Sequence, residues 1–178
     1  MAHDPDACTT YVACQTEEMV LLPARLQAQT CFTSSLQGPI QLVELRWNIA
    51  ATLGDLDDGE GLRLQVFTSD DGPQDEIEAL ELSAAQHGQV GVNVYKFDPP
   101  LNLPEASFCA GIAGGDKTAD CGLGVYIDTN ADLDLALSYA TVDYDNGCEI
   151  PNFTELSELL LESDPGWCIE ALVQKLPL

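Results

Sequence analysis

Apolar and polar residues alternate along most of the chain after residue 39, with the period of two that is typical of half-buried β-strands. The first clear run is Val43, Leu45, Trp47, Ile49 and Ala51. Clusters of Gly, Asp and Pro separate such runs and mark turns. The expected strands cover residues 43–51, 62–66, 77–82, 90–94, 101–104, 108–112, 121–127, 133–139 and 167–173. This pattern predicts an all-β fold, namely an antiparallel β-sandwich or jelly roll of about eight or nine strands.

One short helix is expected near residues 153–161. Asn152 is a favourable N-cap residue, and Glu155 stands three positions later, as in a capping box. Apolar residues then follow at helical spacing. A pair of strands is the alternative for this segment.

The segment from Ser107 to Tyr139 is predicted to form a hairpin followed by a third strand. Its two arms, 108–112 and 121–127, flank a Gly-rich turn at 114–117, and each arm carries one Cys. The strand at 101–104 ends in Pro and is expected at a sheet edge, because Pro cannot donate to a β-ladder.

The length of 178 residues suits one domain. Residues 1–38 show no clear alternation and contain three Cys, so we expect an N-terminal Cys-containing segment packed on the domain. Residues 39–178 are expected to form the β-sandwich itself.

The chain carries 30 acidic and 6 basic residues, a net charge of −24. Nucleic acid binding requires clustered Lys and Arg that neutralise phosphates, and the six bases here are scattered. The same repulsion argues against anionic membrane surfaces, and no apolar run reaches the length of about 18 residues that a membrane span needs. Cations, neutral molecules and basic partners remain compatible with this charge. Solubility alone is the alternative reason for the acidity.

The seven Cys residues predict disulfides and therefore a secreted, extracellular protein. They form no C-x-x-C pair and only two His accompany them, so a zinc site is not expected. Candidate bridges join Cys109 to Cys121, Cys148 to Cys168, and Cys8 to Cys14 or Cys31. An odd number leaves one Cys unpaired or bonded to another molecule. No signal peptide is visible in this chain, which is expected if it has been removed from an exported protein.

The second half of the chain resembles a β-sandwich, jelly-roll-like module of secreted bacterial proteins. The matching landmarks are Phe108-Cys109-Ala110-Gly111, the strand and acidic loop Gly124–Asn130, the pair Ser138-Tyr139 and the closing strand Gly166–Ala171. In the closing strand of that module a basic residue stands where this chain has Glu170. The resemblance implies a fold and an extracellular setting and carries no activity.

An alternating acidic segment, Asp128-x-Asn130-x-Asp132-x-Asp134, is the candidate metal site. Carboxylate and amide oxygens are the ligands that Ca²⁺ prefers, so Ca²⁺ is the one cofactor the sequence suggests. The spacing departs from a helix–loop–helix calcium loop, because Leu133 and Tyr139 replace the Gly and Glu of that motif. The alternative is a solvated acidic loop.

Aromatic residues are the second candidate for binding. Tyr126, Tyr139 and Tyr144 lie near the acidic loop, where aromatic rings beside carboxylates and amides suit a sugar. The alternative places these rings at the rim of the core. Trp47 and Trp167 share parity with aliphatic residues and are expected in the core.

No catalytic constellation is visible. His87 lies in a polar loop and is expected at the surface, without a recognisable nucleophile. We therefore expect a non-enzymatic extracellular binding or adhesion protein, assisted by Ca²⁺, that recognises a glycan or a surface partner. One alternative is a structural subunit of a surface assembly, self-associating through the unpaired Cys or the N-terminal segment. Another is an acidic hydrolase.

Overall fold

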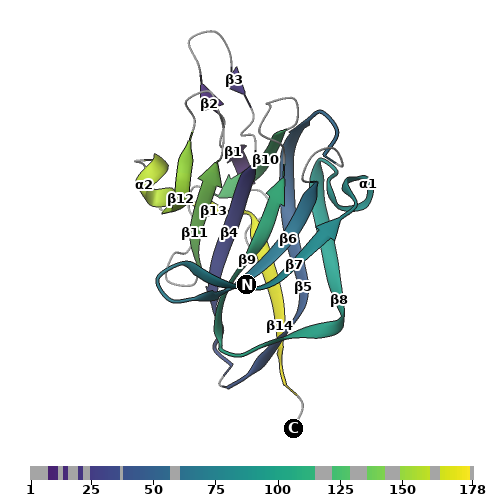
Figure 1. Cartoon of the computed structure of the whole chain (residues 1–178), viewed down its shortest axis with the longest axis vertical. Helices are drawn as coiled ribbons and strands as arrows, with labels where there is room; N and C mark the ends of the chain where they lie inside the picture. Colours follow the sequence, from purple (N-terminus) through teal and green to yellow (C-terminus); the bar gives the residue numbers. More distant parts are fainter. Residues whose placement is uncertain are drawn as a thin grey trace.

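The computed structural model describes residues 8–11, 14–15, 20–21, 25–36, 38–56, 61–114, 122–128, 136–142, 149–160 and 165–176. Two antiparallel sheets stack face to face, which confirms the predicted β-sandwich (Figure 1). In the described part of the chain these sheets hold twelve strands, more than the eight or nine expected. A separate short ribbon pairs β2 (Cys14–Gln15) with β3 (Val20–Leu21).

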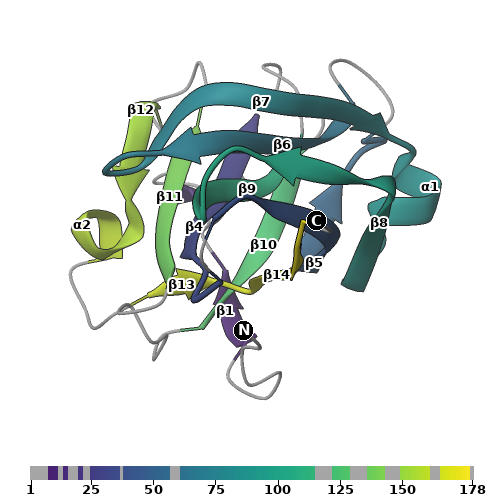
Figure 2. The ribbon, with the colours of Figure 1, turned by 90° about the horizontal axis from the view of Figure 1, so that it is seen from below.

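The first sheet, called the β4 sheet, has the order β12-β11-β4-β9-β6-β7. Its strands are β4 (Leu26–Thr33), β6 (Leu62–Ser69), β7 (Pro73–Leu82), β9 (Ser107–Gly114), β11 (Ala136–Val142) and β12 (Ile150–Glu155). Figure 2 shows β6 and β7 curving across this sheet toward β11 and β12.

The second sheet, called the β5 sheet, is built on the long strand β5 (Ile40–Leu53). Strand β8 pairs with β5 on one side, and β14 and β10 pair with it along different parts of its length. The remaining strands of this sheet are β1 (Cys8–Tyr11), β8 (Gly91–Leu103), β10 (Gly122–Asp128), β13 (Gly166–Trp167) and β14 (Ile169–Lys175). Strand β8 contains residues 101–103 and pairs only with β5, so the predicted edge position is confirmed.

The core lies between the two sheets and contains both tryptophans, as predicted. Trp47 is 1% exposed and Trp167 is fully buried. Trp167 also joins the sheets through polar contacts, because its indole Nε1–H donates to the carbonyl of Tyr139 at 2.8 Å. Its backbone N–H donates to the hydroxyl of Ser138 at 2.9 Å. Ser138 in turn contacts the hydroxyl of Thr30, so one buried polar cluster links β13, β11 and β4.

The hairpin predicted between residues 107 and 127 is wrong. Strand β9 pairs with β4 and β6, whereas β10 belongs to the β5 sheet and pairs with β5, β1 and β13. The chain therefore crosses from one sheet to the other between the two expected arms. The third strand, β11, pairs with β4 and β12.

The N-terminal segment 1–38 contributes strand β4, which lies between β11 and β9. This part of the segment belongs to the sandwich and does not pack on its outside. Helix α2 covers Leu156–Leu160, inside the expected range 153–161. The residues before it are strand: Thr154 and Glu155 pair with β11, so Asn152 is not a helix cap. A second short helix, α1, covers Ala84–His87.

A bulge in β5 changes which side chains face the core. The register with β8 shifts between Leu42 and Glu44, so Leu42 and Leu45 are both fully buried. Val43, predicted to face inward, is half-buried instead. Glu44 is 6% exposed on the opposite face, where it pairs with Arg46 and with Lys96 at 3.7 Å.

Candidate functional site

The face of the β4 sheet turned away from the core carries a second, smaller hydrophobic cluster, called the outer cluster. It contains Cys31, Phe67, Cys109 and Tyr139, all less than 9% exposed, with Leu137 and Phe153 packed against them. An outward face would normally be open to solvent, so the burial of these side chains requires a cover.

The β6–β7 hairpin supplies that cover. Its turn, 69–73, has the composition predicted for a turn, and Asp71 and Gly72 adopt positive φ angles of 57° and 118°. Gly72 lies against the ring of Tyr139, since a Cβ built there would be 3.2 Å from Cε1. Phe67, on the same hairpin, contacts Phe153 edge to face with ring centroids 5.6 Å apart. The hairpin therefore folds over the outer face as far as β11 and β12.

Beneath the hairpin, amide side chains form a buried polar chain across β9. Nε2 of Gln29 donates to Oε1 of Gln65 at 3.5 Å, and Nε2 of Gln65 donates to Glu76 at 3.2 Å. Gly111 lies between the two glutamines in register, so no side chain separates them. Oε1 of Gln29 is buried without a hydrogen-bond partner among the described residues.

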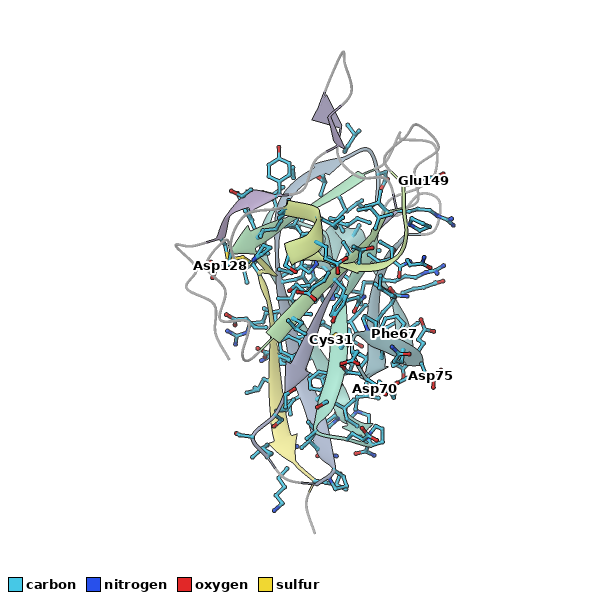
Figure 3. All side chains as sticks on the ribbon, turned by 90° about the vertical axis from the view of Figure 1, so that its left-hand side faces the viewer. Cys31, Phe67, Asp70, Asp75, Asp128 and Glu149 are labelled. Carbon is cyan, nitrogen blue, oxygen red and sulfur yellow. A yellow bond between two sulfur atoms is a disulfide. The ribbon has the colours of Figure 1, made fainter. Side chains whose placement is uncertain are left out.

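An open groove of about 490 Å³ lies on this side of the sandwich, beside the covered cluster. Its lining combines two amides, a hydroxyl, a carboxylate and an aromatic ring with apolar groups: Gln27, Thr141, Val142, Glu149, Ile150, Pro151, Asn152 and Phe153. Gln27 and Thr141 are paired neighbours on β4 and β11, and β12 provides the opposite wall. Figure 3 shows Glu149 on the same side of the molecule as Phe67 and Asp75. A groove of this size and mixed lining suits a small polar ligand.

The phenol of Tyr139 responds to the acidic surroundings of the outer cluster. Burial raises the pKa of Tyr139 above its ordinary value of 10.0, and the carboxylates of Glu155, Asp71 and Glu158 raise it further. The pKa shift therefore reflects first the burial of the phenol and then the carboxylates around it.

This pKa shift predicts a loss of stability at alkaline pH. In the unfolded chain the phenol ionises near pH 10, while the folded protein keeps its proton to higher pH. The stabilisation is therefore complete below the unfolded pKa and is lost as pH rises through the folded pKa. Denaturant unfolding between about pH 9 and 11.5 should show this decline, and Tyr139→Phe should reduce its slope. An identical slope in both proteins would contradict the assignment.

The structure does not bring the predicted tyrosines together. Tyr139 is buried under the hairpin on the β4 sheet, whereas Tyr126 is half-buried on β10 of the β5 sheet, opposite Tyr11. Tyr144 lies outside the described residues. The tyrosine platform expected for a sugar is therefore not formed by Tyr126 and Tyr139.

Asp128 is the one residue of the predicted Ca²⁺ site that the structure describes. Asp128 ends β10, is 5% exposed, and stands on the opposite side of the molecule from Glu149 (Figure 3). Asn130, Asp132 and Asp134 fall outside the described residues, so this site stays a prediction. We expect Ca²⁺ to raise the melting temperature and chelator to reverse the rise. Neither heat nor a melting shift on calorimetric titration would reject it.

The predicted disulfide pairings are wrong. Cys109 bonds to Cys31, not Cys121, because β9 and β4 are adjacent and these residues face each other in register. Cys168 bonds to Cys8, not Cys148, since β1 and β13 both lie beside β10. Cys8 therefore pairs with neither Cys14 nor Cys31. Cys121 and Cys148 lie outside the described residues.

Two further features lie outside the groove, a second cavity and the surroundings of His87. A cavity of about 330 Å³ opens at the other end of β4, between Phe32, Leu36, Phe108, Ala171 and Val173, and its lining is mainly apolar. His87, expected at the surface, is half-buried with its ring centroid 5.7 Å from that of Tyr95 and 6.2 Å from that of Trp47. This packing makes His87 part of an aromatic cluster.

Comparison with known proteins yields a fold likeness alone. No protein-family model matches the chain, and no curated protein sequence matches it. One similar solved structure is that of the cysteine protease and lectin-like domains of Cwp84, a surface layer associated protein of Clostridium difficile, with a TM-score of 0.56 and 14% identity. The match covers 87% of this chain and 33% of that chain, so this chain spans about a third of its length. The likeness concerns the β-sandwich fold alone.

Sequence reasoning missed the groove residues. Gln27, Thr141 and Asn152 are polar and lie far apart along the chain, and only strand pairing brings them together. The one available signal was the pair Gln27 and Gln29 in an otherwise apolar strand, since polar residues of equal parity mark the face away from the core.

Proposed function

We propose that the protein is an extracellular, non-catalytic binding module that recognises a glycan in the groove between β4, β11 and β12. The groove is the observation that carries this proposal. Its amides of Gln27 and Asn152, the hydroxyl of Thr141 and the carboxylate of Glu149 provide donors and acceptors for sugar hydroxyls. The ring of Phe153 provides an apolar surface beside them.

Two further observations support this assignment. The disulfides Cys8–Cys168 and Cys31–Cys109 are typical of proteins in oxidising compartments outside the cytosol. The architecture is similar to that of a lectin-like domain in a bacterial surface protein.

In the described part of the chain, no helix is long and apolar enough to cross a membrane.

A glycan array followed by calorimetric titration tests the proposal. Gln27→Ala and Asn152→Ala should each weaken binding about tenfold, because each removes an amide that hydrogen-bonds the sugar. Gln86→Ala, an equivalent change on the exposed surface of α1, should leave the affinity unchanged. Equal effects of all three substitutions, or no glycan bound at all, would contradict a glycan site in this groove.

A further inference from the structure

The charge around the groove is negative. Glu149 is exposed and forms part of its lining. Asp71, Glu155 and Glu158 are close enough to Tyr139 to act on its phenol. Tyr139 and Thr141 share the outward face of β11, so these carboxylates stand beside the same surface.

In the described part of the chain, two bases, Arg25 and Arg63, lie in or next to strands of the β4 sheet. Arg63 stands directly opposite Glu81 in the β6–β7 ladder. Arg25 precedes β4 and already has an interaction partner of its own. The whole chain carries a net charge of −24, so no distant field reverses the local sign.

The groove lining holds one carboxylate, that of Glu149, and its other polar side chains, the amides of Gln27 and Asn152 and the hydroxyl of Thr141, can accept hydrogen bonds as well as donate them. The unpartnered Oε1 atom of Gln29 does not belong to this lining, because Gln29 is fully buried. A ligand with a positively charged donor therefore suits both the carboxylate and the acceptors of the groove. A protonated amine offers N–H donors, no acceptor and a positive charge.

We propose, as a consequence that rests on the proposed function, that the groove prefers saccharides bearing a free amine over N-acetylated or carboxylated saccharides. A free divalent cation fits this surface less well, because the described residues contain no group of three or more His, Cys, Asp or Glu placed to hold a metal. Glu149 is the residue expected to bind the protonated amine, because it is the charged side chain of the groove lining.

The test uses three oligosaccharides of equal length, namely a glucosamine oligomer, its N-acetylated form and a uronic acid oligomer. The amine form should bind about tenfold tighter than the acetylated form, and the uronic acid form should bind weakest. Raising the ionic strength from about 0.05 M to 0.3 M should reduce affinity for the amine form several-fold and change that of the acetylated form little.

The matched variants are Glu149→Gln and Glu105→Gln. Glu149→Gln should remove most of the preference for the amine, because it should lower the affinity for the amine form far more than the affinity for the acetylated form. Glu105 is exposed in the turn between β8 and β9, outside the groove lining, and its replacement should change neither affinity.

The outcomes separate the two proposals. If the acetylated form binds as tightly as the amine, and Asn152→Ala still weakens it, the glycan site stands and the preference is overturned. If no saccharide binds, the proposed function fails. If a lysine-rich peptide displaces the amine saccharide with equal affinity, the groove recognises charge alone and the saccharide class is overturned.

Discussion

Replacing Gly111 with alanine is expected to prevent stable folding of the β4 sheet. A Cβ atom at this position would lie 1.9 Å from the carbonyl oxygen of Ala28, on the neighbouring strand β4. Real Cβ atoms do not approach a backbone oxygen so closely, so β4 and β9 would have to separate. Overpacking of this kind, against backbone that cannot rotate away, should cost about 3 kcal/mol or more. The position also lies between Gln29 and Gln65, whose contact a separation of the strands would break.

Guanidinium unfolding and the yield of soluble protein measure this effect. Gly91→Ala is the matched control, because Gly91 has no atom within 4 Å of a built Cβ but has a φ of +102°. It should lose only the cost of a strained backbone, about 1–2 kcal/mol. If Gly111→Ala unfolds at the same denaturant concentration as the control, the close approach of β4 and β9 is not the reason for this glycine.

The fold class was predictable because alternation is a local property of the chain. Strands β6 and β9 show it clearly, because alternate apolar residues are buried in the core as the pattern requires: Leu62, Leu64 and Val66, and Phe108, Ala110 and Ile112. Strand β4 was missed for the opposite reason. Gln29 and Thr30 are fully buried there, so these polar residues belong to a central strand that is buried on both faces. The hairpin over the outer cluster explains the burial of Gln29, and no residue next to β4 in the sequence predicts this cover.

Strand partners were not predictable, because pairing is a long-range property. Residues 108–112 and 121–127 have the composition of hairpin arms, yet they join different sheets. The wrong Cys109–Cys121 assignment follows from this error, because that bond was expected within a hairpin that does not form. The bulge at Leu42–Glu44 is a similar case, because one extra residue reverses the parity and leaves the composition unchanged.

The candidate site depended on such long-range pairing still more strongly. Gln27 and Thr141 become neighbours only through the β4–β11 ladder, and Asn152 reaches them only because β12 follows β11 in the sheet. Tyr139 was selected for its position near an acidic segment. The structure instead places it under the β6–β7 hairpin, where Gly72 covers its ring. The position of Tyr139 close to an acidic segment in the sequence therefore did not predict that its side chain is buried.

Removing the Cys31–Cys109 disulfide is expected to produce the other large loss of stability. The bond joins residues 78 positions apart, and closing a loop of that length restricts the unfolded chain by about 4–5 kcal/mol in the chain-entropy model. Both cysteines are also buried in the outer cluster, with Cys109 fully inaccessible. Their replacement by alanine removes packing against Phe67 and Tyr139 as well as the crosslink. The double variant Cys31→Ala/Cys109→Ala should therefore lose about 4 kcal/mol or more in denaturant unfolding.

The second bond provides the comparison that separates crosslink from packing. Cys8–Cys168 spans 160 positions, so its removal should cost at least as much if chain entropy alone decides. Cys8 is only half-buried on the short strand β1, so less packing is lost with it. The Cys31–Cys109 variant could instead lose more free energy of unfolding than the Cys8–Cys168 variant, and its folded form could bind a hydrophobic dye. Both results together would show that the crosslink also keeps the β6–β7 hairpin over the outer cluster. Each bond is expected to stabilise the fold, because it joins strands that are distant in sequence and adjacent in the structure. A loss below about 1 kcal/mol in both variants would contradict this role.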